Sequence, residues 1–394
     1  MRILHTSDWH LGRIFHGIHL TDDQAYVLNQ LTGLVKEWQA DAVIIAGDIY
    51  DRAVPPVEAV KLLDEVLSKI ILDYQVPVIM IAGNHDSPER IGFAARLMAQ
   101  HNLHAKGVFE TPFNPIIISD KDGPVYFYAI PYSEPAATRE KLTLEGNPDH
   151  NECMSAVVKQ IIQTFPKKAR KVAVTHAFVA GSLTSDSERP LSVGGAGTVD
   201  GLHFSHFNYT ALGHLHKPQF APGQTKNEKN MELNIIRYAG SPLKYSFLES
   251  DHKKSVSLVE IDVTGRTKTE EVQLSPKRDV RCLSGFLEEI IASAEHDSYR
   301  EDYLMVSLND KGAILDAMGK LRDVYPNVLH IERPLFSQTH AIQQRVGDYR
   351  TTSDIDLFAA FFKEVSGDIL SEEEKQAFIK EVEKLHQLER ESVP

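Results

Sequence analysis

Five short apolar segments of this sequence each lead into aspartate, asparagine or histidine. The segments are residues 2–4, 42–46, 76–82, 172–174 and 209–212. In open α/β sheets, ligands bind beyond the carboxyl ends of the strands, so the polar side chains after these segments predict one shared site. The candidate metal ligands are Asp8, His10, Asp48, Asn84, His176, His214 and His216.

The spacing within these motifs suits metal binding. In an extended segment, residues i and i+2 point the same way, so Asp8 with His10, and His214 with His216, can each offer two ligands to one place. Asp48 begins a loop and could bridge two ions with its two carboxylate oxygens. Carboxylate, amide and imidazole donors suit Mn²⁺, Fe²⁺ or Zn²⁺, not a thiolate-bound structural zinc.

Each motif taken alone has a purely structural explanation. Residues 79–87, Ile-Met-Ile-Ala-Gly-Asn-His-Asp-Ser, could be a simple turn, because Gly and Asn tolerate left-handed backbone angles. Asp-x-His is common by chance, and a lone His176 is more often a buried, hydrogen-bonded histidine. The ordered set at five strand ends favours a metal centre over these explanations.

Alternating strands and helices must position these side chains. Further strand-like runs occupy residues 125–130, 235–238 and 255–261, whereas residues 22–39 and 57–71 carry apolar side chains at helical spacing. This alternation predicts a layered α/β domain that ends near residue 275.

A Ser-Pro-Lys-Arg stretch at residues 275–278 predicts a domain border. The segments that follow it predict a small capping domain over residues 276–340. They are a helix over 283–294, a strand over 303–308, a helix over 312–323 and a strand over 328–332.

Residues 341–394 are expected to form a linker and a helical tail. The stretch 337–351 is polar and typical of a linker, and two amphipathic helices follow it. The second helix would open with a capping box from Ser371 to Glu374. Apolar side chains on the first of these two helices could dock onto the parent domain or insert into a partner's groove. They are Leu357, Phe358, Phe361, Phe362 and Val365.

Composition predicts a soluble cytoplasmic protein of two or three domains. The chain has 394 residues, 42% hydrophobic and 25% charged, and its two cysteines exclude a disulfide framework. The N-terminus does not resemble a secretory signal, and no apolar run approaches membrane-spanning length. The net charge of −13 does not exclude a nucleic-acid partner, because eleven of the acidic residues lie in residues 351–394 beside five basic ones.

The ordered motifs resemble the calcineurin-like metallophosphoesterases. The shared pattern is Asp-x-His, Gly-Asp-x-x-Asp, Gly-Asn-His-Asp, His and Gly-His-x-His. The stretches 6–12, 185–191 and 239–247 resemble, more narrowly, the SbcD-type nuclease subunits within this superfamily. The resemblance implies an αββα sandwich with a small α/β capping domain and a helical tail.

The resemblance also implies roles for individual residues. It places Asp8, His10, Asp48 and His216 on a first metal ion. Asp48, Asn84, His176 and His214 would hold a second ion. His85 would stand over the phosphate, with its imidazole held in orientation by Asp51. The expected ions are Mn²⁺.

The implied activity is metal-dependent DNA cleavage by a two-metal mechanism, with exonuclease action on duplex ends and endonuclease action on single strands or hairpins. Implied partners are DNA, an SbcC-type coiled-coil ATPase and a second nuclease subunit, together forming a heterotetramer that works in DNA repair and recombination. The chain has no Gly-x-x-x-x-Gly-Lys-Ser/Thr loop, so any ATP dependence must come from another chain.

Two other functions are compatible with the same motifs. One is a phosphoesterase acting on nucleotides, small phosphodiesters or phosphoproteins, which would not need the second domain and tail. The other is a non-catalytic scaffold, which usually has eroded ligands, whereas every ligand position is intact here.

Basic residues follow the metal motifs closely and predict a rim that positions DNA phosphates. They are Arg13, Arg52, Arg90 and Lys217. Ordinary solvated surface is the alternative explanation for each of them.

Overall fold

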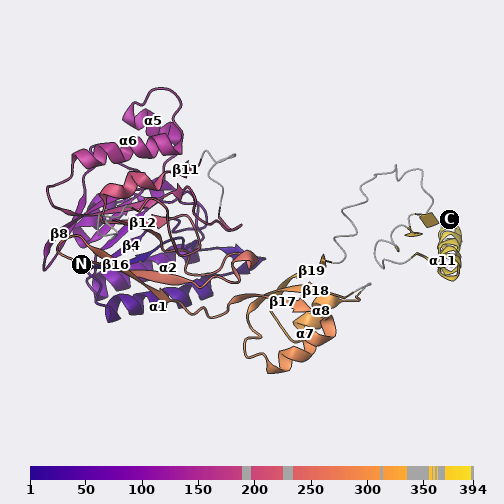
Figure 1. The fold of residues 1–394 in the computed structure, drawn as a ribbon. Helices are drawn as coiled ribbons and strands as arrows, with labels where there is room; N and C mark the ends of the chain where they lie inside the picture. The colour runs from indigo at the N-terminus through magenta and orange to yellow at the C-terminus, as the bar shows by residue number, and fades with distance from the viewer. Residues whose placement is uncertain are drawn as a thin grey trace. The chain divides into compact units, whose positions relative to one another are not determined.

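The computed structural model of the chain describes residues 1–188, 197–224, 234–310, 314–334, 355–356, 358–359, 362 and 369–391 (Figure 1). By their internal contacts, residues 1–279 form one unit and residues 280–394 a second. The borders predicted at residues 275/276 and 340/341 stay predictions.

A six-stranded sheet supplies three of the five strand ends that matter for the site. Its order is β16-β15-β1-β4-β5-β6. The strands are β1 (Arg2–Thr6), β4 (Ala42–Ile45), β5 (Val78–Ile81), β6 (Leu103–Lys106), β15 (Ser255–Ile261) and β16 (Thr267–Gln273). Strands β1, β4, β5 and β6 run parallel, so their carboxyl ends meet at one edge.

A second six-stranded sheet supplies the other two strand ends. Its order is β13-β14-β12-β9-β8-β7. The strands are β7 (Ile116–Asp120), β8 (Gly123–Ile130), β9 (Arg170–His176), β12 (Tyr209–Gly213), β13 (Gln219–Phe220) and β14 (Ile235–Tyr238). The four central strands are parallel, and the edge strands β7 and β13 are antiparallel to their neighbours.

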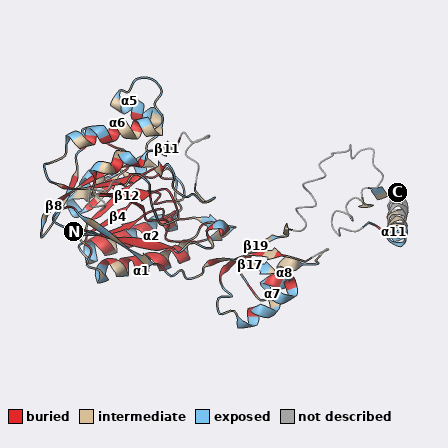
Figure 2. Cartoon of the chain, viewed as in Figure 1, coloured by how far each residue is buried: buried red, intermediate tan, exposed pale blue. Residues whose placement is uncertain are grey.

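The two sheets and the helices form four layers. Along β1, Leu4 packs in the core that contains residues of α1 (Thr21–Glu37) and α2 (Val57–Ser68), whereas Ile3 packs in the core between the two sheets. On the outer face of the second sheet, Val157 and Ile161 of α6 (His150–Gln163) pack in a third core. Figure 2 shows the buried strands of both sheets. The expected αββα sandwich is confirmed.

Smaller elements connect these layers. The strand pairs are β2 (Ile14–Phe15) with β3 (Ile18–His19), and β10 (Phe178–Val179) with β11 (Thr198–Val199). The short helices are α3 (Pro88–Ile91), α4 (Ala95–Met98) and α5 (Pro135–Leu142). The helix predicted over 57–71 ends as a π-helical turn at Lys69–Asp73.

The second unit begins with a three-stranded parallel sheet. Its strands are β17 (Val280–Gly285), β18 (Tyr303–Leu308) and β19 (Val328–Glu332), and its helices are α7 (Leu287–Ser293) and α8 (Ala317–Arg322). The helix predicted from residue 283 was wrong at its start, because residues 280–285 pair with β18 as a strand.

The tail ends in α11 (Glu372–Glu391). Its predicted capping box is confirmed: the Ser371 backbone N–H donates to the Glu374 carboxylate at 2.8 Å, and the Glu374 N–H donates to Ser371 Oγ at 3.3 Å. Phe358 stacks on Phe378 of α11 with 3.9 Å between ring centroids.

Several predicted tail features fall outside the described residues. They are the linker over 337–351 and the side chains Leu357, Phe361 and Val365. Where the structure describes the chain, no helix has both the length and the apolar character needed to cross a membrane.

Candidate metal centre

The predicted ligands converge beyond the ends of five strands, three from the first sheet and two from the second. Asp8 and His10 follow β1, Asp48 follows β4, and Asn84 follows β5. His176 ends β9, and His214 and His216 follow β12. Six of the seven side chains fall into two clusters of three, and Asp48 lies between the clusters.

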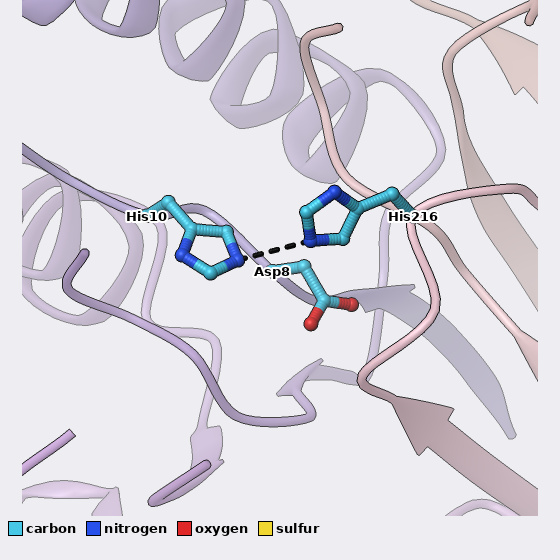
Figure 3. A group of neighbouring side chains, drawn as sticks. All are labelled: Asp8, His10 and His216. Atoms are coloured by element: carbon cyan, nitrogen blue, oxygen red, sulfur yellow. Dashed lines mark hydrogen bonds between the residues drawn. The ribbon is translucent and has the colours of Figure 1, made fainter. Parts of the chain in front are cut away.

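The first cluster consists of Asp8, His10 and His216 (Figure 3). Each offers a ligand atom within 4.8 Å of the others, and all three residues are buried. The Nε2 atoms of His10 and His216 face one another at 3.1 Å. Asp8 Oδ1 also accepts a hydrogen bond from the His214 backbone N–H at 2.9 Å, which ties β1 to β12 across the sheets.

The second cluster consists of Asn84, His176 and His214. The Asn84 amide oxygen lies 2.9 Å from His176 Nε2 and 3.1 Å from His214 Nδ1. The other ring nitrogen of His176 donates to the main-chain oxygen of Ala46 at 2.9 Å, which fixes the ring with Nε2 directed into the cluster.

Asp48 lies between the two clusters. Its Oδ2 is 3.6 Å from His10 Nε2 and 3.5 Å from His176 Nε2. Its Oδ1 instead accepts a hydrogen bond from the backbone N–H of His85 at 2.9 Å. The expectation that Asp48 bridges two ions with its two oxygens stays a prediction, and Oδ2 is the oxygen that lies near histidines of both clusters.

The backbone that aims these side chains is not extended. Asp8, His10 and Asp48 have positive φ angles of 54°, 45° and 48°, and His214 has 107°. The extended backbone predicted for Asp8 with His10, and for His214 with His216, is therefore wrong. Left-handed turns bring Asp8 and His10 together, while His214 and His216 face different clusters. Non-glycine residues in this region are strained, and such strain is concentrated at functional sites.

Two glycines allow the loops to approach one another. At Gly47, where φ is +93°, a Cβ atom would lie 2.4 Å from His176 Nδ1. At Gly83 a Cβ atom would lie 2.2 Å from Asp48 Oδ1. A side chain at position 83 would therefore clash with the Asp48 carboxylate, and glycine leaves the space that this carboxylate occupies.

The spacing of the donor atoms fits a metal shell. With bonds of about 2.1 Å, neighbouring ligands are about 3.0 Å apart in an octahedron and about 3.4 Å apart in a tetrahedron. Five neighbouring pairs of donor atoms are 2.9–3.6 Å apart: His10 with His216, Asn84 with His176 and with His214, and Asp48 Oδ2 with His10 and with His176. Asp8 offers an oxygen within 4.8 Å of the His10 and His216 ligand atoms. The residues present therefore fit two divalent cations.

The electrostatics of the site also favour cations. Burial raises the pKa of Asp8 to about 6, and burial together with nearby Asp48 raises the pKa of Asp86 to about 6. Across the described parts of the chain, no lysine or arginine forms an ion pair with Asp8, Asp48 or Asp86. The centre therefore holds buried carboxylates without a lysine or arginine partner.

The histidines differ in protonation. Burial lowers the pKa of His10 well below its usual value and that of His214 to about 3, so both rings are neutral donors. Burial also opposes the charge on His176, but the adjacent Asp48 carboxylate raises the pKa of His176 to about 9. A cation at the second cluster must therefore displace the His176 proton.

His85 lies beside the first cluster, with its ring centroid 4.7 Å from that of His10. Its Nδ1 donates to the main-chain oxygen of Asp51 at 2.9 Å. The Asp51 carboxylate accepts from Arg13 at 2.8 Å. Asp51 therefore contacts His85 as expected, but through its backbone.

The four basic residues have different surroundings. Arg13 is bound to Asp51, and its guanidinium carbon lies 5.7 Å from the Tyr245 ring centroid. Arg52 and Arg90 are exposed, and Lys217 is half-buried. Within the described residues, the side chains of Arg52 and Arg90 form no ion pair.

Several supporting residues were missed from the sequence. Asp86 accepts backbone N–H groups of Ile49 at 3.1 Å, Tyr50 at 2.9 Å and Gly83 at 2.9 Å, and so ties two metal-motif loops together. The Gln24 amide donates to the main-chain oxygen of His10 at 2.7 Å. The fixed place of Asp86 beside Asn84 and His85 was an available signal, whereas Gln24 lies in an ordinary helix and gives none.

Comparison with known proteins gives two family matches. The family described as calcineurin-like phosphoesterase matches residues 1–218. The family described as type 5 capsule protein repressor C-terminal domain matches residues 276–366. These two domains in this order are consistent with an SbcD-type protein.

Three solved structures resemble the chain at low identity. They are TT1561 of Thermus thermophilus (14% identity, 68% of this chain and 98% of that chain covered, TM-score 0.39), GAP50, the anchor in the inner membrane complex of Plasmodium (12%, 71% and 90%, 0.38), and a dimetal phosphatase from Danio rerio (11%, 70% and 98%, 0.37). These TM-scores are too low to establish a shared fold or function.

The match to residues 1–218 spans more than half of the 394-residue chain and includes every predicted metal ligand. It agrees with the donor spacing and the buried carboxylates of the two clusters. The chain belongs to the calcineurin-like phosphoesterase family, whose members use divalent metal ions.

Proposed function

We propose that this protein is a metal-dependent DNA nuclease. It would digest duplex DNA from its ends and cut single strands and hairpins, as a subunit of an ATP-dependent SbcCD-type complex in DNA repair and recombination. The observation that carries the proposal is the pair of clusters sharing one oxygen of Asp48. The match at residues 276–366 favours this nuclease over a hydrolase of small phosphodiesters or phosphoproteins.

The first cluster with Asp48 would hold one Mn²⁺ ion, and the second cluster with Asp48 would hold the other. Bound there, the ions would supply a water of lowered pKa and positive charge for the phosphoryl oxygens. The neutral rings of His10 and His214 offer lone pairs, and the carboxylates of Asp8 and Asp48 offer the negative charge that divalent ions require.

His85 is assigned as the catalytic acid. Its Nδ1 faces a carbonyl oxygen, which can only accept, so Nδ1 carries a hydrogen in either charge state. The proton that can be given away is therefore on Nε2. For DNA, Nε2 would protonate the 3′ oxygen that leaves, and Asp51 would hold the ring through its main-chain oxygen.

Basic side chains would position the flanking phosphates. Arg52 and Arg90 are exposed near the metal motifs, and Lys217 directly follows His216. Arg13 is bound to Asp51, so its guanidinium would have to bind the Asp51 carboxylate and a phosphate at the same time.

The proposed complex contains an SbcC-type coiled-coil ATPase and a second copy of this chain. The exposed apolar residues Val57 and Val60 on α2, which are 68% and 45% exposed, support a homodimer. The helical tail within residues 341–394 is the segment proposed to bind the ATPase.

The test uses the full-length protein with Mn²⁺ and three substrates: end-labelled duplex DNA, a DNA hairpin and a chromogenic phosphodiester. Cleavage of both DNAs is expected. His85→Ala should lower the rate about 10²–10⁴-fold while the protein still binds two ions, measured by equilibrium dialysis. His101→Ala, which changes an exposed histidine of the 3₁₀ turn Ala99–His101, should leave the rate unchanged.

Cleavage of the chromogenic ester alone would identify a small-substrate phosphoesterase instead. Absence of cleavage on all three substrates would favour a scaffold. Loss of metal from His85→Ala would contradict the role assigned to that residue.

A further inference from the structure

A buried ammonium group lies behind the first cluster. Lys254 is 5% exposed, and its Nζ donates to Glu249 Oε2 at 2.5 Å, the His216 main-chain oxygen at 2.8 Å and Ser241 Oγ at 2.9 Å. A lysine has three N–H donors, so all of them are used. One of the three bonds holds the backbone of a candidate metal ligand.

Glu249 connects this ammonium group to the His216 ring. It is fully buried, and its Oε1 lies 3.3 Å from His216 Nδ1. Ser187 donates its hydroxyl hydrogen to Glu249, and its oxygen lies 2.6 Å from His216 Nδ1. Because the carboxylate can only accept, Nδ1 carries the hydrogen. The lone pair of Nε2 then faces the first cluster, 3.1 Å from His10 Nε2.

The corresponding ligand of the second cluster is held differently. His176 Nδ1 donates to the main-chain oxygen of Ala46, which no substitution removes. A carboxylate behind a metal-binding histidine fixes its tautomer and makes it a stronger donor. Glu249 could not stay buried and charged without Lys254, since an unpaired buried charge is strongly destabilising.

We propose that Glu249 and Lys254 are positioning residues that set the divalent-cation affinity of the first cluster through His216. This inference rests on the proposed ligand set. It predicts that removing the Glu249–Lys254 pair weakens binding of the ion at the first cluster. Binding at the second cluster should be unaffected, because His176 there is held by a main-chain oxygen.

The experiment titrates metal-free full-length protein with Mn²⁺ by calorimetry and records the absorption spectrum with Co²⁺. Glu249→Gln and Lys254→Met should each weaken one of the two ions about 10–100-fold and alter the spectrum of that ion only. Lys244→Met is the matched control, because Lys244 forms an ion pair with Asp279 at 2.9 Å and donates to the Ser250 main-chain oxygen at 2.6 Å, and neither residue is a candidate ligand. It should bind both ions normally.

The double variant Glu249→Gln/Lys254→Met separates positioning from folding. It removes both buried charges together, so its melting temperature should exceed that of Lys254→Met, while the loss of one ion persists. Normal binding of two ions by Glu249→Gln would overturn the proposal, as would recovery of both ions in the double variant. His216→Ala serves as the reference: if it keeps both ions, the proposed ligand set itself is wrong.

Discussion

The two ends of the double sheet treat buried carboxylates in opposite ways. At the carboxyl ends of the parallel strands, Asp8 and Asp48 are 0% and 2% exposed, and in the described part of the chain neither has a lysine or arginine partner. At the amino end of β9, Arg170 donates to both oxygens of Asp120, at 2.8 and 2.6 Å. The carboxylates of Asp8 and Asp48 are therefore not neutralised by a lysine or arginine, whereas Asp120 is neutralised by Arg170.

The pKa shifts show what this difference means for stability. Burial raises the pKa of Asp8 to about 6, so the ionised form is disfavoured in the metal-free fold. The hydrogen bonds from Arg170 hold the pKa of the Asp120 carboxyl well below its usual range. Ionisation of Asp120 therefore stabilises the fold, whereas ionisation of Asp8 costs stability, a cost that the proposed metal ion would offset.

Asp8→Asn should have the largest effect of the variants considered. An unchanged rate of hydrolysis would contradict the contrast between the two ends of the sheets. Removing a ligand carboxylate is expected to lower Mn²⁺-dependent hydrolysis at least about 1,000-fold, because an ion contributes several kcal/mol to the reaction. The same change removes a buried charge that has no lysine or arginine partner, so the metal-free protein should gain about 1 kcal/mol in free energy of unfolding. Urea denaturation in chelator measures the gain, and a loss of stability would contradict the contrast.

Asp120→Asn should have the reverse effect. Breaking a buried ion pair is expected to lower the free energy of unfolding by about 3 kcal/mol, because it leaves the Arg170 charge without its partner. Mn²⁺ affinity should remain unchanged, since the pair lies at the other end of the strands. Urea denaturation and metal titration of the same variant test both parts.

This second effect should also depend on pH in a defined direction. Folding lowers the pKa of Asp120, so the pair stabilises the fold above the unfolded pKa of about 4. The stabilisation is lost as the pH falls through the folded pKa. The difference between wild type and Asp120→Asn should therefore be full at neutral pH and shrink below about pH 4. A difference that grows in acid would show that the ion pair is not its source.

The smallest expected effect concerns the arginines around the centre. Arg52 is exposed, so Arg52→Ala should reduce the slope of log affinity for duplex DNA against log salt by about 0.9. Arg13 is already bound to Asp51, so Arg13→Ala should change that slope less. Fluorescence anisotropy at several salt concentrations measures both slopes. Equal changes would show that Arg13 leaves Asp51 when DNA binds.

Most of the buried strands could be predicted from the sequence, and so could the convergence of the candidate ligands, because both depend on local patterns. Buried strands such as β4 are continuous apolar runs, and each ends in a recognisable motif. Strand β16, with the sequence Thr-Lys-Thr-Glu-Glu-Val-Gln, was missed because an edge strand with exposed faces carries few apolar residues.

The arrangement within the site could not be predicted in the same way. That Asp51 contacts His85 through its carbonyl depends on the path of a loop, and side-chain types do not encode it. Lys254 donates to the His216 main-chain oxygen although the two residues are 38 positions apart, and no pattern in the sequence indicates this hydrogen bond. Such contacts require the three-dimensional fold.

The joining of both sheets at one centre has a consequence for how the protein is made. Asp8 bonds the backbone of His214, and His10 faces His216, each pair 206 positions apart. A chain emerging from the ribosome therefore has no complete centre until β12 and the residues after it have been synthesised and folded. Fragments that end before residue 213 would lack a ligand for each proposed ion. Under the proposed function, a truncated or unfinished product would be inactive, and the cell's DNA would meet the nuclease only as a finished domain.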